Sequence, residues 1–187
     1  MTPAEVLQQF VDALQDAALP YMLTGSHASS IHGMPRATLD VDFVVAPSRE
    51  EIRRLVQNLK AAGCYVDDRA ADEALDTHGQ FNAIGLDSGW KADFIIRKPR
   101  AFSRTEFDRR EPGVLYGVEV SVATAEDVLL AKLEWAKLGE SSRQIEDAAN
   151  ILKVRGDRLD RAYVERWVRE LGLAQQWDAA VRSAGMG

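Results

Sequence analysis

Cysteine, long apolar runs and an excess of basic charge are all scarce in this chain of 187 residues. The single cysteine, Cys64, cannot form an internal disulfide, and chains so poor in cysteine are typical of a reducing compartment. No apolar run approaches the roughly 18 residues that suggest a membrane span. The first residues also lack the basic and apolar regions of a secretory signal. We therefore expect a cytoplasmic protein with no membrane partner.

The net charge and the histidines argue against two further classes of site. The chain has 23 Lys and Arg against 29 Asp and Glu, a net charge of −6, so any binding of nucleic acid would need a local basic patch. The three histidines, His27, His32 and His78, have no cysteine or histidine neighbours at the spacing of zinc ligands. The remaining composition, 46% hydrophobic and 28% charged, is that of an ordinary globular protein.

The hydrophobic periods divide the chain into a mixed part and a helical part. They predict strands over 21–24, 39–46, 81–86 and 90–96, a hairpin over 114–122, and helices over 3–18, 26–32, 48–63, 101–109, 124–138, 141–154, 160–171 and 173–184. The acidic stretch 67–79 is expected to be exposed. We expect an α+β fold with two regions: residues 1–122 form a small mixed sheet flanked by helices, and residues 123–187 form a helical bundle.

Two aspartates stand in the strongest strand pattern. Because strand side chains alternate with period two, Asp40 and Asp42 point to the same side of the sheet. Two carboxylates so close repel each other unless a cation or a shared proton relieves them. Magnesium binds through one or two carboxylates together with substrate phosphates, so the pair favours a magnesium site. The alternative is an edge strand that exposes two acids to solvent.

A Gly-Ser pair stands before this strand, where a strand is predicted to turn into a helix. Gly25 lets backbone amides approach a phosphate, and the helix N-terminus adds unpaired N–H donors next to the Ser26 hydroxyl. The alternative is a turn with an ordinary helix cap. A third acid, Asp93, stands in an otherwise apolar strand. Placed beside Asp40 and Asp42, it could bridge a metal and take the proton from an attacking hydroxyl.

These residues together resemble a known family. Gly25-Ser26, Asp40-Val41-Asp42 and Asp93 look like the hG[GS], Dh[DE]h and hDh elements of the DNA polymerase beta nucleotidyltransferase superfamily. The fuller string from Leu23 to Phe43 is similar to its small prokaryotic members, the minimal nucleotidyltransferases and the abortive-infection toxins of AbiEii type. The resemblance covers residues 20–96 and implies a nucleotidyltransferase fold for the mixed part.

The resemblance also implies roles for individual residues. Gly25 and Ser26 would bind the triphosphate of a nucleotide such as ATP. Asp40, Asp42 and Asp93 would be the catalytic residues and would bind two magnesium ions, with Asp93 also acting as the base.

The helical region carries a further resemblance to AbiEii-type proteins, in Lys132 and in the Arg143-x-x-x-Asp147 element. Lys132 would contact nucleotide phosphate, and Arg143 and Asp147 can pair on one helix face. A solvated, salt-bridged helix is the alternative for these three residues. Arg36, just before the aspartate strand, is a further candidate for binding the triphosphate. The basic segment, residues 97–110, has six basic and two acidic residues and could guide a polyphosphate or RNA.

The expected activity is that of a magnesium-dependent transferase. A nucleoside monophosphate would pass from a nucleoside triphosphate to an acceptor hydroxyl on RNA, a protein or a small molecule, with release of pyrophosphate. Two alternatives remain open: a nucleotide-binding or toxin–antitoxin interaction module with a partner protein and no turnover, and a metal-dependent phosphodiesterase.

Overall fold

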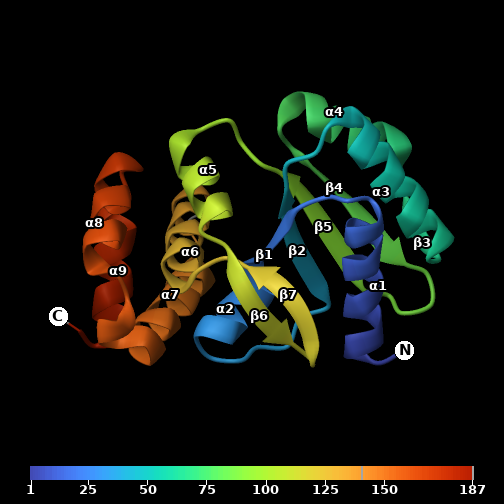
Figure 1. Cartoon of the computed structure of the whole chain (residues 1–187). Coiled ribbons are helices and arrows are strands. Elements are labelled where there is room, and N and C mark those ends of the chain that lie inside the picture. The colour runs from blue at the N-terminus through green and yellow to red at the C-terminus, as the bar shows by residue number, and fades with distance from the viewer. Residues whose placement is uncertain (140, 187) are drawn as a thin grey trace. The chain divides into compact units, whose positions relative to one another are not determined.

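The computed structural model describes residues 1–139 and 141–186, which form two compact units. The sheet unit combines residues 1–24 and 37–122, and the helical unit combines residues 25–36 with the chain from residue 123 onward (Figure 1). The sequence analysis placed residues 25–36 with the sheet, whereas in the structure they group with the C-terminal helices.

The sheet unit contains a seven-stranded sheet. Its strands are β1 (Tyr21–Thr24), β2 (Asp40–Val45), β3 (Cys64–Val66), β4 (Gln80–Gly85), β5 (Lys91–Ile96), β6 (Glu111–Leu115) and β7 (Val118–Val122). They lie in the order β3-β4-β5-β2-β1-β7-β6. The pairs β1–β7 and β2–β5 are parallel and the other neighbours are antiparallel, so the mixed sheet predicted from the sequence is confirmed.

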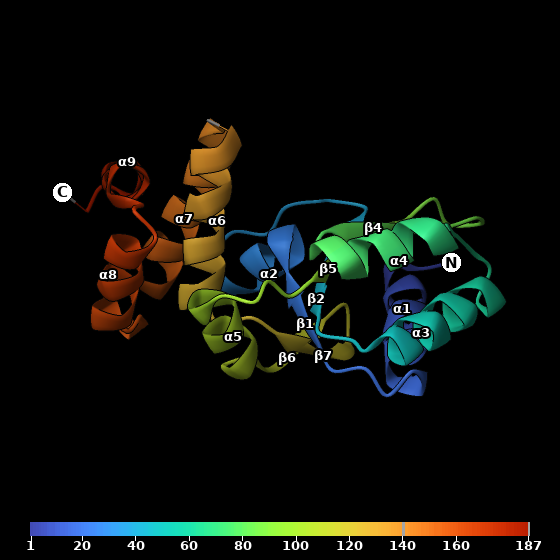
Figure 2. The same ribbon diagram turned by 90° about the horizontal axis from the view of Figure 1, so that it is seen from above.

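Two helices with capping boxes cover one face of the sheet. Helices α1 (Pro3–Asp16) and α3 (Arg49–Ala61) start with Thr2 and Ser48, whose hydroxyls accept the N–H of a glutamate three residues on. The two helices lie side by side on that face (Figure 2). The side-chain amide of Asn58 on α3 donates to the carbonyl of Ala13 on α1 at 3.2 Å.

A row of aromatic side chains forms the centre of the core beneath these helices. Phe43, Phe94 and Phe81 are register partners across β2, β5 and β4, and neighbouring rings stack with centroids 5.7 and 5.1 Å apart. All three are buried. Because strand side chains alternate, the residues on either side of these phenylalanines point to the opposite face. The candidate aspartates lie on that opposite face.

The acidic stretch 67–79 contains a helix that the sequence analysis did not expect. Helix α4 (Asp68–Thr77) begins where the side chain of Asp67 accepts the N–H groups of Arg69 and Ala70. The short edge strand β3 was also missed, since three residues are too few to show a period. Helix α5 (Ala101–Asp108) completes the unit and lies where the sequence predicts it.

The helical unit consists of α2 (Gly25–His32), α6 (Ala125–Gly139), α7 (Ser142–Arg155), a short 3-10 helix (Gly156–Arg158), α8 (Arg161–Glu170) and α9 (Ala174–Ala184). The predicted C-terminal helical bundle is confirmed. No helix of the described residues is long and apolar enough to cross a membrane.

A buried histidine explains why α2 belongs to this unit. The Nε2 atom of His32 lies 2.7 Å from the carbonyl oxygen of Ala123, and its Nδ1 atom lies 2.7 Å from the guanidinium of Arg155. A carbonyl oxygen can only accept and a guanidinium can only donate. The Nε2–H group of His32 therefore donates to Ala123, Nδ1 accepts from Arg155, and the ring is neutral. At Gly33, a Cβ would approach the backbone of Ile151 to 3.2 Å, so α2 and α7 contact each other closely.

Candidate functional site

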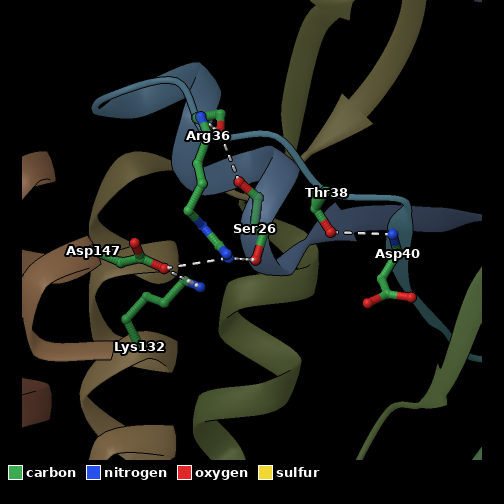
Figure 3. Close-up of polar contacts among 7 residues, drawn as sticks. Ser26, Arg36, Thr38, Asp40, Lys132 and Asp147 are labelled. Atoms are coloured by element: carbon green, nitrogen blue, oxygen red, sulfur yellow. Dashed lines mark hydrogen bonds and ion pairs between the residues drawn. The ribbon is translucent and has the colours of Figure 1, made fainter. Parts of the chain in front are cut away.

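The three aspartates singled out in the sequence lie on two neighbouring strands. Strands β2 and β5 are parallel, and Asp42 is the register partner of Asp93. Asp40 lies two residues before Asp42 and therefore on the same face. Asp93 is buried, Asp42 is half-buried and Asp40 is exposed, so the cluster runs from the core to the surface. The backbone N–H of Asp40 donates to the hydroxyl of Thr38 at 3.1 Å, which fixes the start of β2 (Figure 3).

A lysine from β5 lies among these carboxylates. The Nζ atom of Lys91 is 2.9 Å from Oδ2 of Asp93 and 3.6 Å from Oδ1 of Asp40, its register partner. The hydrogen bond to Asp93 raises the pKa of Lys91, and the charges of Asp93 and Asp40 raise it further. The side chain is therefore a cation at neutral pH. The sequence analysis did not single out Lys91, although its place two residues before Asp93 put both side chains on one face.

The carboxylate oxygens of this cluster are suitable ligands for a divalent cation. Carboxylate oxygens are the ligands that magnesium prefers, and two of the three aspartates already hold a cation, the ammonium of Lys91. Among residues 1–139 and 141–186, no three acidic, histidine or cysteine side chains are close enough together to hold a metal ion in this conformation. The Lys91 ammonium lies within 3.6 Å of both Asp40 and Asp93 in this conformation.

The sheet face that bears the cluster continues into exposed side chains on β4 and β3. On β4, Asn82 is the register partner of Asp93 and Ile84 is the register partner of Lys91. On β3, Tyr65 is the register partner of Ile84. All three are exposed. A ligand can therefore reach this side of the carboxylate cluster from solvent.

The Gly-Ser pair lies where β1 ends and α2 begins, as the sequence predicts. Gly25 has φ +65°, a left-handed conformation that favours glycine. The Ser26 hydroxyl accepts a hydrogen bond from the Arg36 guanidinium (Figure 3). The backbone N–H of Arg36 in turn donates to the Ser30 hydroxyl at 3.1 Å. These contacts hold a guanidinium beside the first turn of α2.

A buried ion pair joins helices α6 and α7 next to this arginine. The Nζ atom of Lys132 lies 2.8 Å from Oδ2 of Asp147, and the side chains are only 5% and 12% exposed. The guanidinium of Arg36 lies 4.0 Å from the same oxygen (Figure 3). The burial excludes a solvated helix face as the explanation for Lys132. The expected pair between Arg143 and Asp147 is not formed among the described residues, because Asp147 faces α6 while Arg143 is exposed.

The structure thus gathers the predicted site residues into two sets. Asp40, Asp42 and Asp93 form the carboxylate cluster of the sheet unit. The second set, in the helical unit, is the phosphate-binding candidate set, which consists of Gly25, Ser26, Arg36 and Lys132.

Three arginines of the basic segment, residues 97–110, contact aromatic rings of the same segment. The guanidinium carbons of Arg97 and Arg110 lie 5.3 and 4.3 Å from the ring centroid of Phe107, and that of Arg100 lies 5.4 Å from the ring of Phe102. Such cation–π contacts order these side chains on the surface of α5. Arg97, Arg100 and Arg110 therefore pack against the phenylalanines of this helix.

Solved structures resemble this arrangement over nearly the whole chain. The antibiotic-resistance protein ANT(2")-Ia in complex with adenylyl-2"-tobramycin matches with a TM-score of 0.61 and 18% identity, covering 95% of this chain and 99% of that one. The chain has a nucleotidyltransferase fold. The lincosamide adenylyltransferase LnuA, bound to lincomycin, has a TM-score of 0.57 and 12% identity, with coverages of 82% and 98%.

A third solved structure has the same fold. A nucleotidyltransferase-like protein from Paracoccidioides brasiliensis matches with a TM-score of 0.53 and 17% identity, over 92% of this chain and 91% of that one. No protein-family profile and no curated protein matches the sequence. The fold expected from the sequence motifs is therefore confirmed through structure alone.

Proposed function

We propose that the protein is a magnesium-dependent nucleotidyltransferase that moves a nucleoside monophosphate from a nucleoside triphosphate to an acceptor hydroxyl and releases pyrophosphate. The observation that carries the proposal is the pairing of Asp42 with Asp93 across parallel strands, with Asp40 on the same face. A buried structural strand has no need of three carboxylates in this arrangement, whereas transfer of a charged phosphoryl group does.

Each set of side chains has a chemical task in this proposal. Arg36, Lys132 and the Ser26 hydroxyl would bind the triphosphate oxygens, since guanidinium and ammonium groups form charge-assisted hydrogen bonds with phosphate. Asp40, Asp42 and Asp93 would hold two magnesium ions, which would neutralise the phosphates.

The transfer replaces one bond to the α-phosphorus with another. The acceptor oxygen forms a bond to the α-phosphorus, and the bond from that phosphorus to the pyrophosphate oxygen breaks. The proton of the acceptor hydroxyl passes to the carboxylate of Asp93, which is hydrogen-bonded to Lys91 in the free protein.

The finer part of the proposal concerns the acceptor and the partner. ANT(2")-Ia and LnuA, which share the fold, are seen with a modified tobramycin and with lincomycin, so a small-molecule hydroxyl is one acceptor class to test beside RNA and protein. Lys132 and the Arg143-x-x-x-Asp147 element resemble elements of AbiEii-type toxins, so we also propose a partner protein of the toxin–antitoxin kind, acting in the cytoplasm.

The experiment is an incubation with α-labelled ATP, CTP, GTP and UTP, with magnesium, and with RNA, cell protein and small-molecule acceptors. Asp42→Asn removes one carboxylate at constant size. Asp178→Asn, at an exposed position of α9, is the matched control. We expect the wild type and the control to label an acceptor and release pyrophosphate, and Asp42→Asn to lose at least a hundredfold.

The other outcomes decide among the alternatives. Undiminished labelling by Asp42→Asn would refute the proposed role of the carboxylate cluster. Calorimetric binding of nucleotide with magnesium but no product would indicate a binding module. Release of free nucleoside monophosphate, with no transfer to any acceptor, would indicate a phosphodiesterase.

A further inference from the structure

The lysine within the carboxylate cluster has no role in the transfer reaction as proposed. Lys91 contacts one carboxylate on its own strand and one on the neighbouring strand, at 2.9 Å from Asp93 and 3.6 Å from Asp40. An exposed lysine gains little free energy from pairing with an acid. Here the two contacts come from aspartates that the proposed function assigns to metal.

The charges of the cluster explain why a cation is needed there. Asp42 and Asp93 are register partners on adjacent strands, and Asp40 lies two residues before Asp42. The charges of the three carboxylates therefore repel each other when all three are ionised. Asp93 is nearly buried, with 12% of its side chain exposed, and a buried carboxylate without a partner is costly. Lys91 supplies that partner, at 2.9 Å from Oδ2 of Asp93.

The same position brings the lysine into competition with a metal. Magnesium binds carboxylate oxygens at about 2.0–2.1 Å, so it cannot share the Oδ2 atom of Asp93 with an ammonium at hydrogen-bond distance without strong repulsion. The Lys91 side chain is 37% exposed and ends a flexible four-carbon stem, so it can swing away toward solvent. Entry of a divalent cation would therefore displace the ammonium.

We propose that Lys91 is a resident counter-ion of the carboxylate cluster, which balances Asp40 and Asp93 while no divalent cation is bound and which such a cation must displace. This inference rests on the proposed metal-binding role of these aspartates. It predicts that the free protein binds a divalent cation weakly, and that removal of the ammonium strengthens the binding. Displacing the ammonium loses its attraction to the two carboxylates of Asp93 and Asp40, which even in water-like surroundings is enough to weaken binding by about tenfold or more.

The test is a titration of the full chain with Mn²⁺, with the free ion followed by electron paramagnetic resonance. Lys91→Met removes the ammonium and keeps the length of the side chain. Lys60→Met is the matched control, because Lys60 pairs with a single aspartate, Asp68, on the surface of the sheet unit. We expect the Kd for Mn²⁺ to fall about tenfold or more in Lys91→Met and to stay within about twofold of wild type in Lys60→Met.

Thermal unfolding gives a second readout that does not depend on activity. Without its counter-ion the cluster is more repulsive, so Lys91→Met should melt at a lower temperature than wild type in the absence of metal. Saturating Mg²⁺ should raise its melting temperature more than that of wild type or of Lys60→Met. If Lys91→Met does not fold, Lys91→Gln, which keeps a polar side chain, is measured in the same two assays.

The outcomes separate this inference from the proposed function. An unchanged or weaker affinity for Mn²⁺ in Lys91→Met overturns the counter-ion role, even if Asp42→Asn abolishes transfer. Tighter Mn²⁺ binding without any transfer activity supports the counter-ion role and refutes the proposed enzyme. No Mn²⁺ binding by wild type or variant overturns the inference and the metal-dependent part of the proposed function together.

Discussion

The buried pair between Lys132 and Asp147 allows a quantitative prediction for the helical unit. Asp147→Asn keeps the shape of the side chain but removes the negative charge that lies 2.8 Å from the ammonium of Lys132. The side chain of Lys132 is only 5% exposed. Removal of one partner of a buried ion pair costs about 3–5 kcal/mol. The guanidinium of Arg36, 4.0 Å from the same oxygen, loses a favourable charge as well. The amide oxygen of asparagine can still accept a hydrogen bond, so we expect the lower end, about 3 kcal/mol.

The assay is urea unfolding followed by circular dichroism, with an exposed pair as control. Glu170→Gln breaks the 2.8 Å pair with Arg166 on α8, whose two side chains are about half exposed. Such an i,i+4 surface pair contributes at most about 0.5 kcal/mol. Adding Lys132→Met to Asp147→Asn should recover part of the loss, because no charge then stays buried. Equal destabilisation by Asp147→Asn and Glu170→Gln would refute the account of this pair.

Three further outcomes follow from local features. Gly25→Ala should destabilise the protein to urea by about 1–2 kcal/mol, because its φ is +65°, whereas Gly139→Ala, where φ is not positive and a Cβ meets open space, should not. Hydrogen bonds from the backbone and then the hydroxyl of Ser48 lower the pKa of Glu51, so the stability that Glu51→Gln removes should be present at neutral pH and be lost in an acid titration as the pH falls through the lowered pKa. Burial raises the pKa of Cys64, so a thiol reagent should modify it slowly in the native protein and rapidly in urea.

The carboxylate cluster could be predicted because it depends on strand alternation. Asp40 and Asp42 share a face by period two alone, and an isolated acid in the apolar strand around Asp93 is a strong local signal. The register that pairs Asp42 with Asp93 could not be predicted, since it is fixed by contacts between strands that are far apart in the sequence. The same period-two alternation places Lys91 on one face with Asp93, so Lys91 could also have been predicted from the sequence.

The helical unit was harder to anticipate from sequence. Its helices follow from amphipathic periods, but the grouping of α2 with α6 and α7 depends on the buried His32 and on the close approach at Gly33, which no local pattern reports. Helix α4 was missed because its acidic composition masked the capping aspartate that begins it. The partner of Asp147 depends on the packing of two helices, which a spacing of four within α7 does not reveal.

Both candidate sets already contain a charge that stands where a ligand's charge would act. Asp147 neutralises Lys132 and approaches Arg36, as a phosphate oxygen would, and Lys91 neutralises Asp93 and Asp40, as a divalent cation would. These internal pairs let the ligand-free chain keep charged groups half-buried without the cost of leaving them unpaired. Under the proposed function each pair must loosen when its ligand binds, so each pair lowers the affinity for that ligand.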